Sequence, residues 1–252
     1  MPERKVKSII MELKDIRIVY EDSRLIVIDK PSGMLTMSTG RSGDVTAYSI
    51  LFDYVRMSAK RAGERLFIVH RLDRDTSGLL VFAKDLDTKT ALQEKWDEMV
   101  LERKYLALLE GYIEDEEGWI ETWLHENPKS MKVHCHTFEK RDDRNIPPVK
   151  GWQYASSHCR TVRKGQIDGK PYTCVEFELE TGRKNQIRVH SEWIGHPIAG
   201  DRKYGATSNP IGRLALHAHT LEFIHPWTGK KMRFTSKAPS SFGRLKESHI
   251  LK

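Results

Sequence analysis

The stretch FIVHRLDRDTSGLLVFAK, residues 67–84, places a short polar segment between two apolar runs. Each run has the length of a buried strand, and the Thr-Ser-Gly before the second run is typical of a tight connection. We therefore predict strand, connection and strand. The connection carries one His, two Arg and two Asp, and a loop held between buried strands is a rigid support for reactive groups. The alternative from pattern alone is a charged surface turn with a glycine for its geometry.

Composition predicts a soluble globular protein with a basic surface. The chain has 252 residues, 38% hydrophobic and 31% charged, which suits one large domain or two intimate subdomains. No apolar stretch approaches the ~18 residues of a membrane span, and we expect no signal peptide. Three cysteines without a CxxC pair favour a reducing cytoplasm over a disulfide framework. The net charge of +7 favours a polyanion, most often nucleic acid, as partner.

Hydrophobic periodicity and turn residues predict an α+β fold with a mixed, mostly antiparallel central sheet and flanking helices. Strands are expected at 16–20, 25–29, 104–111, 172–180, 213–223 and 231–235, and helices at about 44–62, 85–99 and 185–195. Val175, Phe177 and Leu179 are expected to face a core, and the glutamates between them solvent. Segment 127–151, rich in Lys, Arg, Asp and Pro, is expected to be a turn-rich excursion with a partly mobile loop.

Two enzyme motifs partly resemble the central stretch. His70-Arg71-Leu72-Asp73 is similar to the catalytic loop of protein kinases, but an extra Leu intervenes and neither Asp-Phe-Gly nor a Gly-rich phosphate loop accompanies it. Asp73-Arg74-Asp75-Thr76 resembles the nucleophile motif of haloacid-dehalogenase-like phosphatases, with Asp201 as a late Mg²⁺ ligand. In those enzymes the first Asp follows directly on an apolar strand, and a second late acidic residue is present. A Mg²⁺-dependent phosphatase is therefore only a minor alternative.

The closer resemblance is to the RluA family of pseudouridine synthases, in which the pattern His-Arg-Leu-Asp-x-x-Thr-Ser-Gly-Leu-Leu recurs. Further motifs of that family follow in order: Lys-Pro-x-Gly at 30–33, Lys-Tyr at 104–105, Gly-Arg-x-x-Gln-Ile-Arg-Val-His at 182–190, Gly-His-Pro-Ile-x-Gly-Asp-x-x-Tyr-Gly at 195–205, and Leu-His-Ala at 216–218 ahead of His-Pro at 225–226. The resemblance implies the pseudouridine synthase fold, an α+β sheet divided by a catalytic cleft. It makes 16–239 the catalytic domain, with two intimate subdomains, 1–15 an N-terminal extension and 240–252 a C-terminal tail.

The reaction that the resemblance implies needs a carboxylate at the ribose. Pseudouridine formation cuts the bond from ribose to ring nitrogen N1 and joins ring carbon C5 to the same ribose carbon. No electrons or phosphate are exchanged, so no cofactor is expected. The resemblance makes Asp73 the nucleophile or base, and the covalent and glycal routes both stay open. It implies that Arg188 pairs with Asp73 to keep it ionised, and that Tyr105 stacks on a uracil flipped out of the RNA and helps to remove its C5 proton.

The remaining site residues are assigned to substrate binding. The resemblance implies that Ile187 packs under the target base and that Arg71 contacts RNA near the flipped nucleotide. His70 belongs to this set, although a structural role suits it better, and Arg183 and Lys184 are expected on an RNA-facing basic surface. Most family members have His where this chain has Asn185, a departure expected to affect substrate preference more than chemistry.

A metal site is considered because His and Cys residues recur along the chain, but their spacing matches no zinc motif: His125, His134, Cys135, His136, His158 and Cys159. We expect no metal. The prediction is thus a monomeric, cytoplasmic enzyme that isomerises uridines in structured RNA, either tRNA or 23S-type rRNA, without a membrane partner. The alternative to the enzymes is a non-catalytic RNA-binding relative, and the joint presence of Asp73, Tyr105 and Arg188 argues against it.

Overall fold

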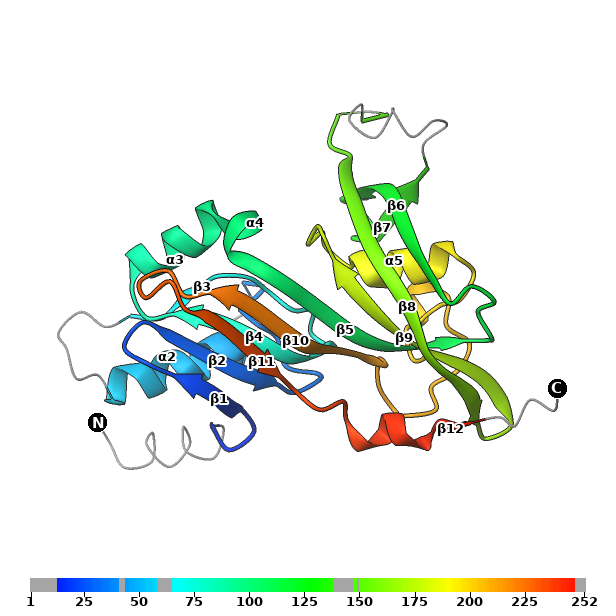
Figure 1. Cartoon of the computed structure of the whole chain (residues 1–252), viewed down its shortest axis with the longest axis horizontal. Helices are drawn as coiled ribbons and strands as arrows, with labels where there is room; N and C mark the ends of the chain where they lie inside the picture. The colour runs from blue at the N-terminus through cyan, green and yellow to red at the C-terminus, as the bar shows by residue number, and fades with distance from the viewer. Residues whose placement is uncertain (1–12, 41–43, 59–64, 138–146, 149, 248–252) are drawn as a thin grey trace. The chain divides into compact units, whose positions relative to one another are not determined.

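The computed structural model describes residues 13–40, 44–58, 65–137, 147–148 and 150–247. The chain divides into two compact units, each built from two separate chain segments (Figure 1). Unit 1 comprises Met1–Arg103 and Ala218–Lys237, and unit 2 comprises Lys104–His217 and Ala238–Lys252. Most of the predicted N-terminal extension, the end of the first predicted helix, and residues 138–146 and 149 of the segment predicted at 127–151 lie outside the described residues.

Unit 1 contains the central sequence stretch within a sheet. Its strands are β1 (Arg17–Glu21), β2 (Leu25–Lys30), β3 (Phe67–Ile68), β4 (Ser77–Ala83), β10 (Leu216–Ile224) and β11 (Lys231–Thr235). β2 pairs with β1 and β4, β3 with β4, and β11 with β10, all antiparallel. All seven residues of β4 are buried, because strands flank it on both sides. The predicted strand, connection and strand are confirmed, with residues 69–76 as the connection.

Three helices complete unit 1: α2 (Ala47–Ser58), α3 (Leu86–Glu94) and α4 (Trp96–Met99). Ala47, Ile50, Leu51 and Val55 follow the i, i+3, i+4 spacing of one helix face, and all four are buried. The single helix predicted at 85–99 is interrupted at Lys95, which ends α3 and precedes α4. Leu92 of α3 is a buried member of the apolar core of this unit.

The glycine of the central motif is required by a neighbouring strand. Gly78 has φ +113°, and a Cβ at this position would lie 2.1 Å from the carbonyl oxygen of Ala218 in β10. No side chain fits in that space, because real Cβ contacts below about 3 Å do not occur and this φ is one that L-residues rarely adopt.

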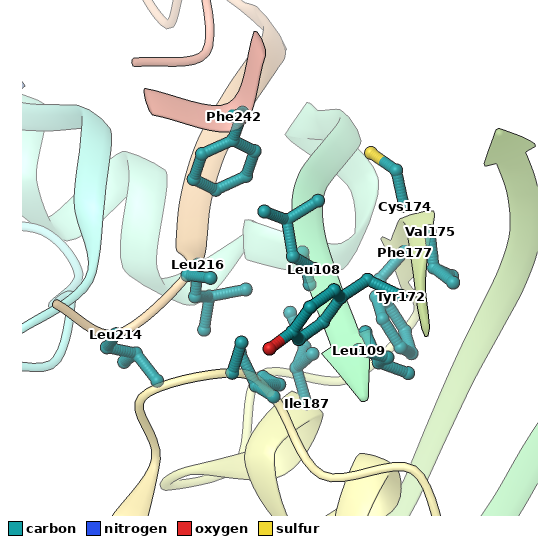
Figure 2. Close-up of a cluster of buried hydrophobic side chains, with 14 of the residues drawn as sticks. Leu108, Leu109, Tyr172, Cys174, Val175, Phe177, Ile187, Leu214, Leu216 and Phe242 are labelled. Atoms are coloured by element: carbon teal, nitrogen blue, oxygen red, sulfur yellow. The ribbon is translucent and has the colours of Figure 1, made fainter. Parts of the chain in front are cut away.

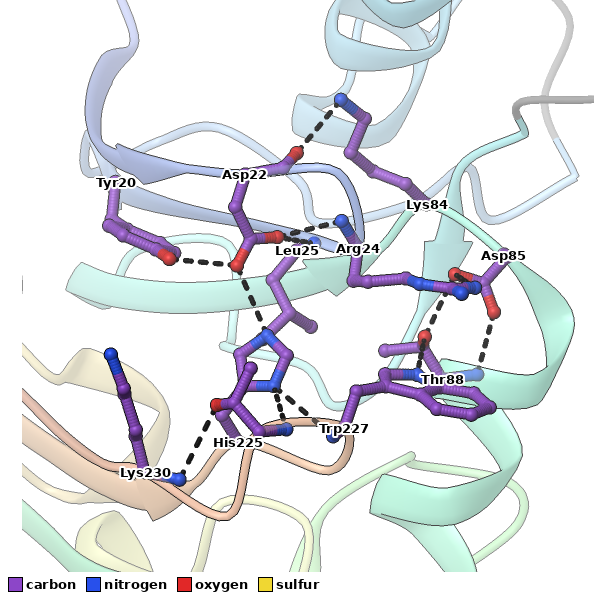
Figure 3. A network of polar contacts seen from close by, with 11 residues as sticks. Tyr20, Asp22, Arg24, Leu25, Lys84, Asp85, Thr88, His225, Trp227 and Lys230 are labelled. Carbon is purple, nitrogen blue, oxygen red and sulfur yellow. Dashed lines mark hydrogen bonds and ion pairs between the residues drawn. The ribbon is translucent and has the colours of Figure 1, made fainter. Parts of the chain in front are cut away.

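A carboxylate ties the two turns of unit 1 together. Asp22, between β1 and β2, accepts hydrogen bonds from the backbone N of Leu25 at 2.8 Å, the Tyr20 hydroxyl at 2.7 Å and Nε2 of His225 at 3.1 Å (Figure 3). Burial alone would raise the pKa of Asp22, but the hydrogen bonds outweigh it and the pKa is lowered. The hydrogen bond from the Tyr20 hydroxyl to Asp22 raises the pKa of Tyr20 to about 12. The turns at 22 and 225 are thereby fixed to each other across 203 positions of sequence.

Unit 2 is built around an antiparallel sheet with the order β5-β9-β8-β6-β7. Its elements are β5 (Val100–Glu110), β6 (Glu117–Glu126), β7 (Val133–His136), β8 (Gln153–Ile167), β9 (Lys170–Leu179), helix α5 (Gln186–Trp193) and the short 3-10 helices η2 (Arg202–Tyr204) and η3 (Ser240–Arg244). A last strand, β12 (Lys246–Glu247), pairs with β8. The strands at 104–111 and 172–180 and the helix at 185–195 are confirmed, while β6 and β8 were not predicted and β7 lies within the expected excursion.

The core of unit 2 gathers side chains from segments far apart in sequence. Leu108 of β5, Tyr172 and Phe177 of β9 and Ile187 of α5 meet Phe242 of η3 in one buried cluster (Figure 2). Val175 is buried as predicted, but Leu179 is only half-buried. Residues 240–247, expected as a tail, supply η3 and β12. The predicted fold class, α+β with a mostly antiparallel sheet, is confirmed by both units.

Candidate active site

The loop that carries Asp73 is fixed on both sides of that residue. Before it, Thr36 Oγ1 donates to the carbonyl of Leu72 at 2.9 Å and accepts from the Leu72 N–H at 3.2 Å. After it, the backbone N of Gly33 donates to the carbonyl of Arg74 at 3.0 Å. Leu72 itself is buried, whereas the Asp73 side chain is half-buried. The backbone of the motif is therefore anchored while its central carboxylate stays accessible.

A buried lysine makes the strongest contribution to this anchoring. Lys30, at the end of β2, has no exposed surface, and its Nζ donates to the carbonyl oxygens of Pro31, Met34 and Arg74 at 3.0, 2.7 and 3.0 Å. The two segments 30–34 and 72–75 thus share one ammonium group. Hydrogen bonds from a charged donor are stronger than neutral ones, especially away from water. The Lys-Pro-x-Gly motif includes Lys30, but the sequence alone does not predict this role for it.

His70 supports the same loop from inside unit 1. Its Nε2 accepts a hydrogen bond from the backbone N–H of Val81 at 3.2 Å, and its ring lies 5.2 Å from that of Trp96. Burial, with a smaller contribution from the charge of Arg103, lowers the pKa of His70 to about 3. A neutral histidine that holds β4 matches the structural role considered for it. Arg71, the next residue, is exposed, as an RNA contact requires.

In unit 2, Tyr105 and Ile187 belong to one apolar cluster. Tyr105 on β5 pairs with Phe177 on β9 and packs against the unit 2 core as a partly buried residue. Ile187, in the first turn of α5, is a buried member of that core. The two residues that the sequence assigns to the target base are therefore joined through one cluster, with the phenol at its margin.

Arg188 is held by three residues of unit 2. Its Nε and Nη2 donate to the two carboxylate oxygens of Asp201 at 2.6 and 2.8 Å, and its Nη1 donates to Oδ1 of Asn185 at 3.2 Å. The centre of the guanidinium lies 4.9 Å from the ring centroid of Tyr204. The Asp201 side chain is only 2% exposed, so this bidentate pair is buried. From the sequence, Asp201 was a candidate Mg²⁺ ligand, but in the structure both of its carboxylate oxygens are bound to Arg188.

Local sequence explains why Arg188 is presented in this way. Asn185 precedes α5 with φ +55°, a left-handed conformation that asparagine tolerates. Its amide Nδ2 donates to the hydroxyl of Tyr204 at 2.8 Å, so one side chain joins Arg188 and Tyr204. The departure from the family's usual His therefore lies in contact with Arg188. Gln186 fixes the start of the helix, since its amide binds both Ser156 and Ser157 of β8.

The two basic residues assigned to RNA have intramolecular contacts. Arg183 Nε donates to the carbonyl of Tyr154 at 2.9 Å, and Lys184 forms an ion pair with Glu126. Both side chains are exposed. Surface ion pairs are weak, about 0–1 kcal/mol, so these contacts leave both cations available to a polyanion.

Within the described ranges, no group of three or more His, Cys, Asp and Glu residues is arranged to hold a metal ion. In the same ranges, none of the helices has the length and apolar character needed to cross a membrane. The three cysteines are free thiols.

Comparison with known proteins gives one consistent result. A family model described as RNA pseudouridylate synthase matches residues 24–193. An uncharacterised RNA pseudouridine synthase, YlyB, of Bacillus subtilis is 32% identical over 250 residues, which span 98% of this chain and 77% of the relative. The ribosomal large subunit pseudouridine synthase D of Nitrosomonas europaea is 34% identical over 241 residues, 91% of this chain and 64% of the relative. The solved structure of human RNA pseudouridylate synthase domain containing 4, at 22% identity, aligns with a TM-score of 0.72 over 96% of this chain and 97% of that one.

Proposed function

The chain belongs to the RluA family of RNA pseudouridine synthases, and on that premise we propose that Asp73 is the group that attacks or deprotonates the ribose of a target uridine. Members of the family are isomerases that act on RNA. The observation that carries the assignment is the anchored loop, with Lys30, Gly33 and Thr36 bound to the backbone on either side of Asp73. A reacting carboxylate needs a fixed position relative to its substrate.

In the proposed reaction, Asp73 acts at the ribose carbon bonded to N1. The bond from this carbon to N1 breaks, the base turns, and the bond to C5 forms. The proton on C5 leaves and N1 gains one, so the composition of the nucleotide is unchanged. Asp73 acts as nucleophile in one route and as base in the other, and both need its ionised form.

We assign three residues of unit 2 to the same reaction. Arg188 pairs with Asp73 and keeps its carboxylate ionised, since an adjacent guanidinium favours the charged form. Tyr105 stacks on the flipped uracil and assists removal of the C5 proton, and Ile187 packs beneath the base. The shared core of Tyr105 and Ile187 supports this division of roles.

The substrate that we propose is large-subunit ribosomal RNA, with transfer RNA as the second candidate. Relatives at 33–34% identity bear the name ribosomal large subunit pseudouridine synthase D, which favours the first. A net charge of +7 and the exposed Arg71, Arg183 and Lys184 suit a phosphate backbone. A monomeric, cytoplasmic enzyme is part of the proposal, and the three free thiols are consistent with a reducing compartment.

The decisive experiment maps pseudouridines in total RNA from cells that contain the wild-type chain, Asp73→Asn or Asp75→Asn. Asp75 is the matched control, because it is an exposed aspartate of the same loop. Asp73→Asn should remove one or a few pseudouridines and slow the purified enzyme by roughly 10⁴-fold or more, while Asp75→Asn should keep the wild-type map. Identical maps for wild type and Asp73→Asn would refute the role of Asp73. The position of the lost pseudouridines identifies the RNA.

A further inference from the structure

Arg188 has a carboxylate partner of its own inside unit 2. Asp201 receives two hydrogen bonds from the guanidinium and Asn185 receives one. Three of the five N–H groups of the arginine are thereby committed, so the direction of the other two is fixed. Stacking on Tyr204, itself fully buried, holds the plane of the group. These contacts therefore fix the orientation of the Arg188 guanidinium, although its side chain is long and flexible.

This arrangement is difficult to explain by stability alone. A buried carboxylate–guanidinium pair contributes little net folding energy, since desolvation of both charges offsets their attraction. If Arg188 served only as a counterion for Asp73, it would also need no second carboxylate such as that of Asp201. What a bidentate pair does supply is a defined geometry, because both groups are planar.

We propose that Asp201, together with Asn185 and Tyr204, is a positioning residue for the reaction: it orients Arg188 toward Asp73 and offsets part of the positive charge that Arg188 presents there. This inference rests on the proposed function. It adds a residue that touches neither the substrate nor Asp73 in the proposed mechanism, and it assigns a role to the Gly-Asp-x-x-Tyr motif at 200–204.

Several other charged or titratable groups lie near the pair of Arg188 and Asp201, and a substitution of Asp201 has to be judged against them. Besides Asp201, the ammonium groups of Lys132 and Lys203 lie 5.4 and 5.7 Å from the Tyr204 ring centroid, and Glu192 is bound to Lys132. On α5, burial keeps His190 neutral. Asp201→Asn leaves all of these in place and removes one negative charge next to Arg188. In the proposed pair with Asp73, the guanidinium of Arg188 then carries a less compensated positive charge.

The test compares Asp201→Asn with Asp168→Asn in the full chain. Asp168 is a matched control, because both of its carboxylate oxygens accept from Arg244 Nη2 in an exposed pair, and its φ of +50° suits asparagine. Steady-state rates on the mapped RNA are measured over a range of RNA concentrations, which separates kcat from KM. For Asp201→Asn we expect kcat to fall about 100-fold with KM within about threefold. Asp168→Asn should behave as wild type.

Asn185→Gly provides a second variant if Asp201→Asn does not fold. Glycine accepts the left-handed backbone without strain, so only the amide contacts to Arg188 and Tyr204 are lost. We expect a roughly tenfold lower kcat and faster solvent exchange of the Arg188 Nη1 hydrogens in NMR spectra, since Nη1 is the donor to Asn185. A folded Asp201→Asn with the wild-type kcat overturns the inference. So does an Asn185→Gly with wild-type rate and exchange.

The two proposals fail in distinguishable ways. Should the wild-type chain form no pseudouridine, the proposed function is wrong, while faster exchange of the Arg188 Nε–H in Asp201→Asn than in wild type still decides whether Asp201 holds Arg188. If Asp73→Asn abolishes activity and Asp201→Asn does not reduce it, only the positioning role is wrong.

Discussion

Substituting Lys30 by methionine should destabilise unit 1 and displace the Asp73 loop. Methionine fills a similar volume but donates no hydrogen bond, so the carbonyls of Pro31, Met34 and Arg74 lose their shared donor. The carbonyls of Pro31 and Met34 then lose this donor, at a cost of about 1–3 kcal/mol each, whereas Arg74 keeps its hydrogen bond from Gly33, and removal of the buried charge offsets part of the cost. We expect a net loss of ~3 kcal/mol in the free energy of unfolding. For a chain of this size that corresponds to a fall in Tm of about 6–12 °C.

Thermal unfolding followed by circular dichroism measures the change, with Lys95→Met as the control, because Lys95 is an exposed lysine of the same unit. Single-turnover rates at a temperature where both variants are folded then report on the loop. Lys30→Met should be slower than Lys95→Met, since the anchor next to Asp73 is gone. Equal Tm values for the two variants would refute the reasoning, because a buried ammonium with three acceptors would then contribute nothing.

Three further outcomes are expected. In Gly78→Ala the free energy of unfolding should fall by at least about 3 kcal/mol, or the protein should fail to accumulate, since the new Cβ would meet the backbone of Ala218. A wild-type Tm would contradict the close approach. Burial lowers the pKa of His70 and of His190 to about 3. The unfolded rings protonate near pH 6.5, so stability is complete above that pH and should fall by about 1.4 kcal/mol per pH unit and per histidine on acidification toward 3. Denaturant titrations at pH 7, 6 and 5 check this, and His190→Gln should reduce the slope. Activity should survive a chelator, since the proposed chemistry uses only side chains. The assay uses a short RNA without tertiary structure, so that Mg²⁺ is not needed to fold the substrate. Loss of activity in the chelator that added Mg²⁺ restores would indicate a catalytic metal.

The sequence predicted those elements of the fold in which burial follows a hydrophobic pattern. β2, β4 and α2 carry apolar residues at the spacing of their core faces, and Asp85 caps α3 where the helix was expected to start. β6 and β8 were missed because polar residues occupy their buried positions. Thr122, Ser156 and Ser157 have no exposed surface, yet hydropathy assigns them to solvent. Their hydrogen-bond partners, Gln186 and His190, belong to α5, and no local sequence pattern predicts these contacts between α5 and the strands.

At the candidate site, motif similarity predicts which residues take part but not their contacts. Asp73, Tyr105 and Arg188 were recognised from ordered motifs, whereas the pair between Arg188 and Asp201 joins positions 13 apart in a chain with many acids and bases. Spacing does not select Asp201 from its competitors. Lys30 was missed for a related reason, because a lysine at a strand end is usually solvated. Only the fold brings three carbonyl oxygens to its ammonium.

The division of the chain into two interleaved units has a consequence for biosynthesis. Unit 1 lacks β11 and most of β10 until residue 237 has left the ribosome, although its first 103 residues are made long before. The bond between Asp22 and His225 is among the last to become possible. Unit 2 in turn waits for Phe242 and β12. Both units are therefore completed only after residue 230, and a nascent chain that stops before that point leaves unit 1 without β11 and unit 2 without β12.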